Sequence, residues 1–210
     1  MCGFILTTNT LKKTILSCKN DILHRGPDNQ KFKFLKNYSL YHSRLKILDL
    51  KPRSNQPFTD EDKKFFLLFN GEIYNFLELK KKFQINCKTS SDTEVLFILL
   101  KNFGIKKTLK EIKGMFSFAF VDVKKDKVYC ARDHFGQKPF YYNLDGNFNC
   151  STNIKAVANL NRNLEFDKNC VDFYLNSSGI LPLNRTIYKN IFSLPAGHYL
   201  IFDNKKKSIK

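Results

Sequence analysis

The feature that most limits how this chain can fold is a strand-like run near its middle, Phe116-Ser117-Phe118-Ala119-Phe120-Val121. Neither face of this run carries a charge, so a strand formed here has to be covered on both sides. Other segments rich in β-forming residues, such as Gly3 to Thr8 and Tyr38 to Leu45, alternate with segments of helical spacing. The pattern predicts a layered α+β domain in which strand-rich groups are flanked by helices.

Apolar periodicity and turn residues predict several individual elements. Apolar residues at helical spacing predict one helix from Leu11 to Leu23. A second helix is expected from Asp92 to Asn102, with Ser90 or Ser91 as its N-cap. The pair Asp145-Gly146 predicts the turn of a β-hairpin.

Composition places the chain among globular proteins. Its 210 residues, of which 42% are apolar and 21 are Phe, suffice for the core of one domain. The formal net charge of +17 at pH 7 raises the question of nucleic-acid binding. Most of this excess is Lys spread along the chain, and no helix-turn-helix, RNP or zinc-finger signature accompanies it. We therefore expect no specific nucleic-acid partner.

The sequence contains no signal for a membrane, an export route or a metal. No apolar run approaches the ~20 residues of a membrane-spanning helix, and the N-terminus does not resemble a signal peptide. We therefore expect a cytoplasmic protein with no membrane partner. The six cysteines form no C-x-x-C pair, and no short window holds four metal ligands. Neither a disulfide framework nor a metal site is expected.

Cys2 occupies the position that becomes the N-terminus once the initiator Met1 is removed. An N-terminal cysteine combines a nucleophile with a base, since its thiol can attack a carbonyl while its own α-amine handles the proton. The reference pKa values, about 7.7–8.0 for the α-amine and about 8.5 for the thiol, lie near neutrality. Taken alone, Cys2-Gly3 is better explained as a small pair that starts a strand, so other motifs have to decide.

A series of short motifs follows Cys2-Gly3 along the chain. In order, they are His24-Arg25-Gly26-Pro27-Asp28, Ser43-Arg44-Leu45, Asn70-Gly71-Glu72-Ile73-Tyr74-Asn75, Ser91-Asp92-Thr93-Glu94, Gly114-Met115-Phe116-Ser117-Phe118-Ala119 and Arg132-Asp133-His134-Phe135-Gly136. Their order and spacing resemble those of the class II glutamine amidotransferases and, among these, the N-terminal domain of asparagine synthetase. The resemblance covers residues 2 to about 202.

The resemblance implies an N-terminal nucleophile hydrolase fold, a four-layer αββα sandwich of two antiparallel sheets between helical layers. It also implies a reaction, in which Cys2 attacks the side-chain amide of L-glutamine and ammonia leaves. Water then hydrolyses the remaining γ-glutamyl thioester to glutamate. The motifs from His24 to Asp28 and from Arg132 to Gly136 are implied to be mainly architectural, holding loops near the site.

By the same resemblance, Asn70 and Gly71 form the oxyanion hole, through the Asn70 side-chain amide and the Gly71 backbone N–H. We expect the strand over residues 65–70 to end in a turn at these two residues, which would aim both donors at the substrate. A plain hairpin turn is the alternative explanation of an Asn-Gly pair. The Glu-Ile-Tyr-Asn that follows completes the family motif and favours the oxyanion hole.

Four further residues match the family's glutamine-binding site. Arg44 is implied to hold the α-carboxylate with its forked guanidinium, and Asp92 and Glu72 to receive the α-ammonium group. The backbone around Ile47 is implied to line the same pocket. Two alternatives stay open: Asp92 also suits the start of a helix, and Arg44 could pair within the chain, with Asp49 or Asp28.

The chain lacks the Ser-Gly-Gly-x-Asp-Ser nucleotide loop of a synthetase domain. We divide it into a glutaminase domain over residues 2–202 and the start of a linker over residues 203–210, towards a synthetase domain that it does not contain. ATP and Mg are expected only for that other domain, and no cofactor for this one. The implied partners are L-glutamine, a synthetase domain or subunit in cis or trans, and a second copy in a homodimer of the full-length enzyme.

The acceptor of the ammonia stays open. Aspartate is our first expectation because it is the commonest acceptor that the resemblance implies, but related enzymes amidate sugar carboxylates or other acids. A function of a different class is a catalytically silent interaction module. The presence of Cys2, Arg44, Asn70, Gly71 and Asp92 argues against it, because a released site should have lost one of them.

Overall fold

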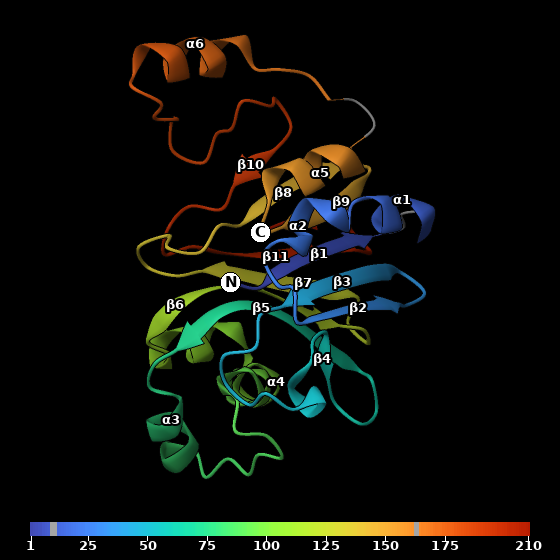
Figure 1. Ribbon diagram of the computed structural model, residues 1–210, viewed down its shortest axis with the longest axis vertical. Coiled ribbons are helices and arrows are strands. Elements are labelled where there is room, and N and C mark those ends of the chain that lie inside the picture. The colour runs from blue at the N-terminus through green and yellow to red at the C-terminus, as the bar shows by residue number, and fades with distance from the viewer. Residues whose placement is uncertain (9–11, 162–163) are drawn as a thin grey trace.

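The computed structural model describes residues 1–8, 12–161 and 164–210 and shows a four-layer αββα sandwich (Figure 1). The first sheet runs, in spatial order, through β10 (Phe192–Ser193), β8 (Tyr141–Asp145), β9 (Asn147–Ser151), β1 (Gly3–Thr8), β3 (Tyr38–Arg44) and β2 (Asn29–Phe34). The second sheet runs through β12 (Ser208–Ile209), β11 (Tyr199–Asp203), β7 (Lys127–Arg132), β6 (Gly114–Asp122), β5 (Phe65–Ile73) and β4 (Phe58–Thr59). Neighbouring strands pair antiparallel in both sheets. The predicted sandwich is confirmed.

Helices cover the outer face of each sheet (Figure 1). The first sheet is covered by α1 (Lys12–Ser17), α2 (Asn20–Leu23) and α5 (Ile154–Leu160), and the second by α3 (Phe76–Lys82) and α4 (Asp92–Glu111). The helix α6 (Lys168–Asn176) lies beyond α5 at one end of the molecule, and a short 3-10 helix, Pro52–Ser54, precedes β4. The N-terminus lies near the middle of the molecule, at the level of the two sheets (Figure 1).

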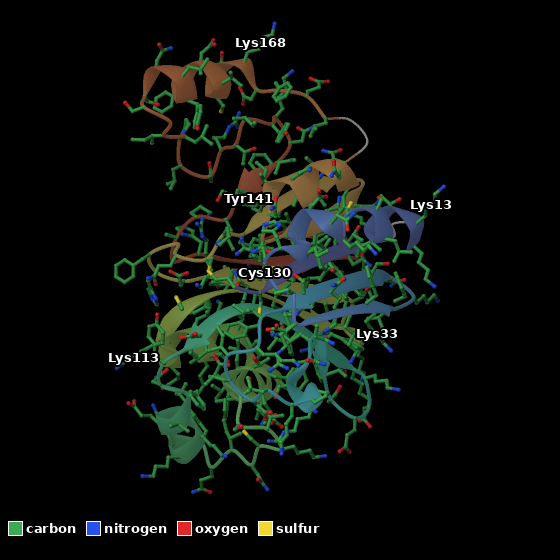
Figure 2. All side chains as sticks on the ribbon, viewed as in Figure 1. Lys13, Lys33, Lys113, Cys130, Tyr141 and Lys168 are labelled. Atoms are coloured by element: carbon green, nitrogen blue, oxygen red, sulfur yellow. The ribbon has the colours of Figure 1, made fainter. Side chains whose placement is uncertain are left out.

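The central apolar run forms β6, and its side chains alternate between two cores. Phe116, Phe118 and Phe120 pack on the α3 and α4 side of the second sheet. Ala119 and Val121 pack between the two sheets. Figure 2 shows the labelled Cys130, from the neighbouring strand β7, in the middle of the molecule. The prediction of a strand buried on both faces is confirmed.

The segment predicted as one helix from Leu11 to Leu23 forms two short helices, α1 and α2. Leu11 itself lies outside the described residues. Between the helices, the backbone N–H of Asp21 donates to the carbonyl of Cys18 at 3.1 Å, a bond across three residues that tightens the chain into a turn. Helical spacing of apolar residues does not reveal this interruption.

The second predicted helix, α4, begins as expected and ends later. Ser91 is its N-cap, since its hydroxyl accepts a hydrogen bond of 3.2 Å from the N–H of Thr93. The helix continues past the predicted end at Asn102 to Glu111, with a kink at Gly104, whose φ is 73°. Glycine adopts this left-handed conformation without the penalty of a Cβ atom.

The strand β5 does not end in a turn at Asn70-Gly71, so that prediction was wrong. The strand continues to Ile73 and pairs with β6 along its whole length. This pairing provides backbone hydrogen bonds that a turn at Asn70 would give up. Gly71 is required for a different reason, because a Cβ atom here would lie 2.1 Å from the carbonyl oxygen of Met115.

Two other features of the sheets concern the predicted hairpin and the end of the chain. The hairpin at Asp145-Gly146 is confirmed, since β8 pairs with β9 on either side of it. Near the C-terminus, β11 ends at Asp203 and β12 pairs with it. The division of the chain at residue 202 stays a prediction.

The surface of the molecule is rich in lysine. Figure 2 shows the labelled Lys13, Lys113 and Lys168 at the periphery, and all three are exposed. Across the ranges that the structure describes, no helix is both long and apolar enough to cross a membrane.

Candidate active site

Cys2 lies immediately before β1, a strand in the interior of the first sheet. Its Sγ lies 3.6 Å from the carbonyl oxygen of Leu45, and its own carbonyl accepts a hydrogen bond of 3.1 Å from Arg25 Nε. Burial raises the pKa of the Cys2 thiol, and the Leu45 contact and the neighbouring Arg44 charge oppose this rise. The thiol is therefore held in place and kept largely protonated until a base takes its proton.

The motif from His24 to Asp28 fastens the end of β3 beside Cys2. A Cβ atom on Gly26 would lie 2.2 Å from the carbonyl oxygen of Ser43, so only glycine allows this approach. The N–H of Asp28 donates to the carbonyl of Arg44 at 3.0 Å, and its carboxylate accepts a bond of 2.7 Å from the N–H of Lys46. The motif thus positions the backbone on both sides of Arg44.

Asn70 is the clearest candidate for an oxyanion donor. Its side chain is 1% exposed, and within the described structure neither its Nδ2 nor its Oδ1 has a hydrogen-bond partner. Leaving a buried amide unsatisfied costs about 1–3 kcal/mol, so native proteins rarely do it without a reason. Such an amide is prepared to donate to a bound group.

Asp92 lies in the first turn of α4 and is 4% exposed. Its Oδ2 accepts a hydrogen bond of 2.9 Å from the N–H of Ile73 at the end of β5, and its Oδ1 accepts one of 3.3 Å from Ser91 Oγ. Burial raises the pKa of the Asp92 carboxyl, opposed by these hydrogen bonds. Glu72, half-buried on β5, is a second acidic group of the same region.

Arg44, at the end of β3, is 4% exposed and engages the loop that follows it. Its Nη1 donates to the carbonyl of Lys51 at 3.2 Å and to Asn55 Oδ1 at 2.8 Å. Its Nη2 donates to the carbonyls of Leu48 and Asp49, at 3.0 and 2.6 Å. Arg44 therefore does pair within the chain, with carbonyl and amide oxygens rather than with a carboxylate.

One pocket of about 60 Å³ brings the predicted residues together. Its lining includes all of the residues proposed from the sequence: Cys2, Arg44, Ile47, Asn70, Gly71, Glu72 and Asp92. Met1 also lines it, so the initiator residue takes up part of the space. The pocket holds a thiol, an amide that has no partner within the described structure, and side chains of both charges. These are the groups needed to hydrolyse the neutral amide of a substrate that also carries a positive and a negative charge.

Sequence reasoning missed Lys138, which lines the same pocket. Lys138 is 5% exposed, and its Nζ lies 3.0 Å from the Sδ of Met1. Burial lowers its pKa, and the Glu72 carboxylate opposes this effect. The residue stands two positions after the Arg132 to Gly136 motif, and neither spacing nor periodicity marks it.

The Arg132 to Gly136 motif fixes the backbone that carries Lys138. The Asp133 carboxylate accepts hydrogen bonds of 3.0–3.2 Å from the N–H groups of Phe116, Phe135, Gln137 and Lys138. The Arg132 guanidinium donates to the carbonyls of Gly136 and Lys138 at 2.7 and 2.8 Å. These contacts make the turn rigid and give the motif the architectural role expected for it.

In the part of the chain that the structure describes, no group of three or more His, Cys, Asp or Glu residues is placed to hold a metal ion. The expectation of ATP and Mg concerns a different domain and stays a prediction.

A family comparison agrees with the geometry of the pocket. The family model described as "Glutamine amidotransferase domain" matches residues 1–210. The chain belongs to this family. The match places Cys2 in a family of enzymes. It confirms the class II glutamine amidotransferase family that the sequence motifs indicated.

Curated relatives of this glutamine amidotransferase domain carry the name asparagine synthetase. The chain is 40% identical to "Putative asparagine synthetase (glutamine-hydrolyzing) 2" of Methanocaldococcus jannaschii, over 95% of this chain and 43% of that protein. It is 34% identical to asparagine synthetase (glutamine-hydrolyzing) 2 of Bacillus subtilis, over 95% of this chain and 28% of that protein. The chain thus spans less than half the length of these two relatives.

Solved structures show the same fold at low sequence identity. The TM-score is 0.68, with 17% identity, to the allosteric regulatory enzyme of purine biosynthesis, covering 100% of this chain and 48% of that one. It is 0.65, with 16% identity, to the glutamine phosphoribosylpyrophosphate amidotransferase of Bacillus subtilis, with the same coverage. At these identities the likeness establishes the fold of the amidotransferase domain and nothing further.

Proposed function

We propose that the pocket around Cys2 hydrolyses the side-chain amide of L-glutamine and releases ammonia. The observation that carries this proposal is that Cys2 and the unpartnered Asn70 amide line one pocket in an amidotransferase domain. The Cys2 thiol adds to the amide carbonyl carbon, and the α-amine of the mature N-terminus takes the thiol proton. This proton leaves with the amide nitrogen as ammonia. Water then cleaves the γ-glutamyl thioester, which yields glutamate and restores the thiol.

In this proposal the tetrahedral intermediates are stabilised by Asn70 and Gly71. Their negative oxygen accepts hydrogen bonds from the Asn70 side-chain amide and the Gly71 backbone N–H. A preorganised donor of this kind contributes about 2.7–4 kcal/mol to catalysis. Support comes from the burial of Asn70 and from the lack of a partner for its Nδ2 within the described structure.

Substrate recognition is assigned to the charged groups of the pocket. Asp92 and Glu72 receive the α-ammonium of glutamine, Arg44 holds the α-carboxylate, and the backbone around Ile47 lines the pocket. Charge-assisted hydrogen bonds to both the α-ammonium and the α-carboxylate distinguish free glutamine from other amides. Because the Arg44 Nη donors contact the loop over residues 48–55, carboxylate binding requires that loop to release some of them.

Removal of Met1 serves this mechanism in two ways. It exposes the α-amine that acts as the base, and it vacates the part of the pocket that the Met1 side chain lines. The ammonia is proposed to pass to an acceptor, aspartate in the first instance, activated with ATP and Mg on a synthetase domain or subunit. A homodimer of the full-length enzyme belongs to the same proposal.

The decisive test uses the chain with Cys2 as its first residue. Release of glutamate from glutamine is measured for this chain, for Cys2→Ala and for Cys87→Ala, which removes a half-buried cysteine outside the pocket. We expect activity in the first and third proteins and none in Cys2→Ala. A chain that retains Met1, verified by intact mass, should also be inactive. Normal hydrolysis by Cys2→Ala would remove Cys2 from the mechanism.

A further inference from the structure

Lys138 is a buried cation whose position the proposed reaction does not yet use. In the described part of the chain, no carboxylate lies within 4.0 Å of its ammonium, and Met1 Sδ is its hydrogen-bond partner. Lysine is almost never buried without an anionic partner, because desolvation of the charge is costly. An unpaired, buried cation in a catalytic pocket is a functional signal.

The geometry brings this cation close to the N-terminus. Lys138 Nζ lies 3.0 Å from Met1 Sδ, and Met1 is joined to Cys2 by one peptide bond. Bond lengths along this short path keep Lys138 Nζ within roughly 9 Å of the Cys2 nitrogen. In the mature chain the thioether is gone and this nitrogen is the α-amine. A cation then faces an amine across the part of the pocket that Met1 lines.

The hydrogen bonds of the Arg132 to Gly136 turn hold Lys138 in place. The N–H of Lys138 donates to Asp133, and its carbonyl accepts from Arg132. A residue held at both ends of its peptide unit places its side chain reproducibly. Loss of Met1 therefore leaves the base of the Lys138 side chain fixed.

We propose that the Lys138 ammonium acts on the α-amine of Cys2 as a fixed positive charge that keeps this amine in its neutral, basic form. A neighbouring cation disfavours protonation of an amine. At this separation in a partly buried site, the effect on the amine pKa is about one unit. The amine then accepts the thiol proton at neutral pH. Lys138 is thus a positioning residue, since it acts through Cys2. This inference rests on the proposed glutaminase mechanism.

Other charges around the pocket also act on the pKa of this amine: the cations lower it and the carboxylates raise it. The charged groups from the packed elements are Arg25 after α2, Arg44 on β3, Glu72 on β5, Asp92 on α4, and Asp133 with Lys138 after β7. Arg44 donates from both Nη atoms to backbone and amide oxygens, and Arg25 donates from Nε to the Cys2 carbonyl while its Nη2 has no partner within the described structure. Both arginines keep a full positive charge that acts in the same direction as Lys138. Once Met1 is removed, Lys138 has no acceptor for its ammonium among its described contacts.

The test compares chains that begin at residue 2: the native sequence, Lys138→Met, Lys138→Arg and Lys110→Met. Lys138→Met removes the charge and keeps the length of the side chain, and Lys138→Arg keeps the charge. Lys110→Met removes an exposed lysine outside the pocket. For each protein, kcat/KM for glutamine is measured against pH. The α-amine pKa is measured separately in a Cys2→Ala background, by competitive acetylation and mass spectrometry of the N-terminal peptide.

We expect Lys138→Met to raise the amine pKa and to move the acidic limb of the pH profile upward, each by about one unit. Lys138→Arg and Lys110→Met should leave both close to the native values. An unchanged amine pKa in Lys138→Met overturns the inference, and so does a higher glutamine KM with an unmoved acidic limb. If the native chain does not hydrolyse glutamine, the proposed function fails, and the amine titration still decides the role of Lys138.

Discussion

The backbone N–H of Ile73 donates a hydrogen bond of 2.9 Å to the buried carboxylate of Asp92, and this bond ties the end of β5 to the first turn of α4. The strand carries the proposed oxyanion donors, and the helix carries a proposed ligand of the substrate ammonium. This hydrogen bond therefore helps to fix the spacing between the proposed oxyanion donors on β5 and the proposed ammonium ligand on α4. Both Asp92 oxygens accept hydrogen bonds within the chain, and in the proposed mechanism the carboxylate also supplies a negative charge to the substrate ammonium.

Asp92→Asn should separate these two roles. Burial raises the pKa of Asp92, so folding favours its neutral form, and stability is lost as pH rises through this raised pKa. Asn imitates the neutral form and still accepts from Ile73. We expect the melting temperature at pH 7.5 to be equal to or above that of the native chain. The glutamine KM should rise at least about tenfold, because the charge that pairs with the ammonium is lost. Unaltered saturation would remove Asp92 from the glutamine site.

Asn70→Ala should reduce catalysis with little effect on folding. The Asn70 amide has no partner in the described structure, so its removal breaks no hydrogen bond. Loss of an oxyanion donor should lower kcat about 10²–10³-fold. Ser117→Ala is the matched control, because Ser117 lies opposite Asn70 on β6, has an equally unpartnered hydroxyl and does not line the pocket. Equal kcat values for both variants would contradict the oxyanion assignment.

Arg44→Ala should affect both stability and binding. It removes four hydrogen bonds to the loop over residues 48–55, and we expect a loss of about 2 kcal/mol or more. The glutamine KM should rise as well. Arg44→Lys should restore only part of the stability and of the glutamine affinity, because lysine lacks the forked donors of the guanidinium. Melting curves and saturation curves on the same preparations provide the measurement.

Arg53→Ala is the control for this loop. Arg53 pairs with Asp49 at 2.9 Å in the same segment, but its side chain is 47% exposed, so the pair contributes at most about 1 kcal/mol. We expect a small change in melting temperature and an unchanged KM. A destabilised Arg44→Ala with native glutamine saturation would assign Arg44 to the fold alone.

His42 should make the fold sensitive to acid. It is fully buried on β3, and burial lowers its pKa to about 4, from a usual value of 6.5. A depressed pKa means that stability is full above pH 6.5 and is lost as pH falls towards 4, by about 3 kcal/mol. His42→Gln should flatten this part of the stability curve, as measured by urea unfolding at several pH values. The exposed His198→Gln should leave the slope unchanged, and equal slopes for native chain and His42→Gln would refute the prediction.

Much of the architecture could be read from local patterns. The apolar alternation over Phe116 to Val121 indicated a strand covered on both faces, because each face of a strand repeats every second residue. The N-cap at Ser91 and the hairpin at Asp145-Gly146 followed from the hydrogen-bonding and backbone preferences of those residues. These features depend on neighbours in the chain, so the sequence contains them directly.

The predicted turn at Asn70-Gly71 shows where local patterns fail. Asn-Gly favours a turn in isolation, yet β6 lies alongside and pairs with β5 through to Ile73. Gly71 is needed because the Met115 carbonyl, on another strand, comes close to it. The residues next to Gly71 in the sequence do not indicate this contact. Pairing with a distant strand outweighed the local preference.

From the sequence by itself came the N-terminal nucleophile, the family of motifs and the residues expected around glutamine. Only the tertiary structure decided that these residues line one pocket, that the Arg44 guanidinium holds a loop, and that Lys138 reaches the N-terminus. The physical reason is that chemistry is a property of single residues, whereas burial and proximity arise when strands and turns far apart in the chain pack together. Lys138 and Met1 are far apart in the sequence, yet Lys138 Nζ lies 3.0 Å from Met1 Sδ.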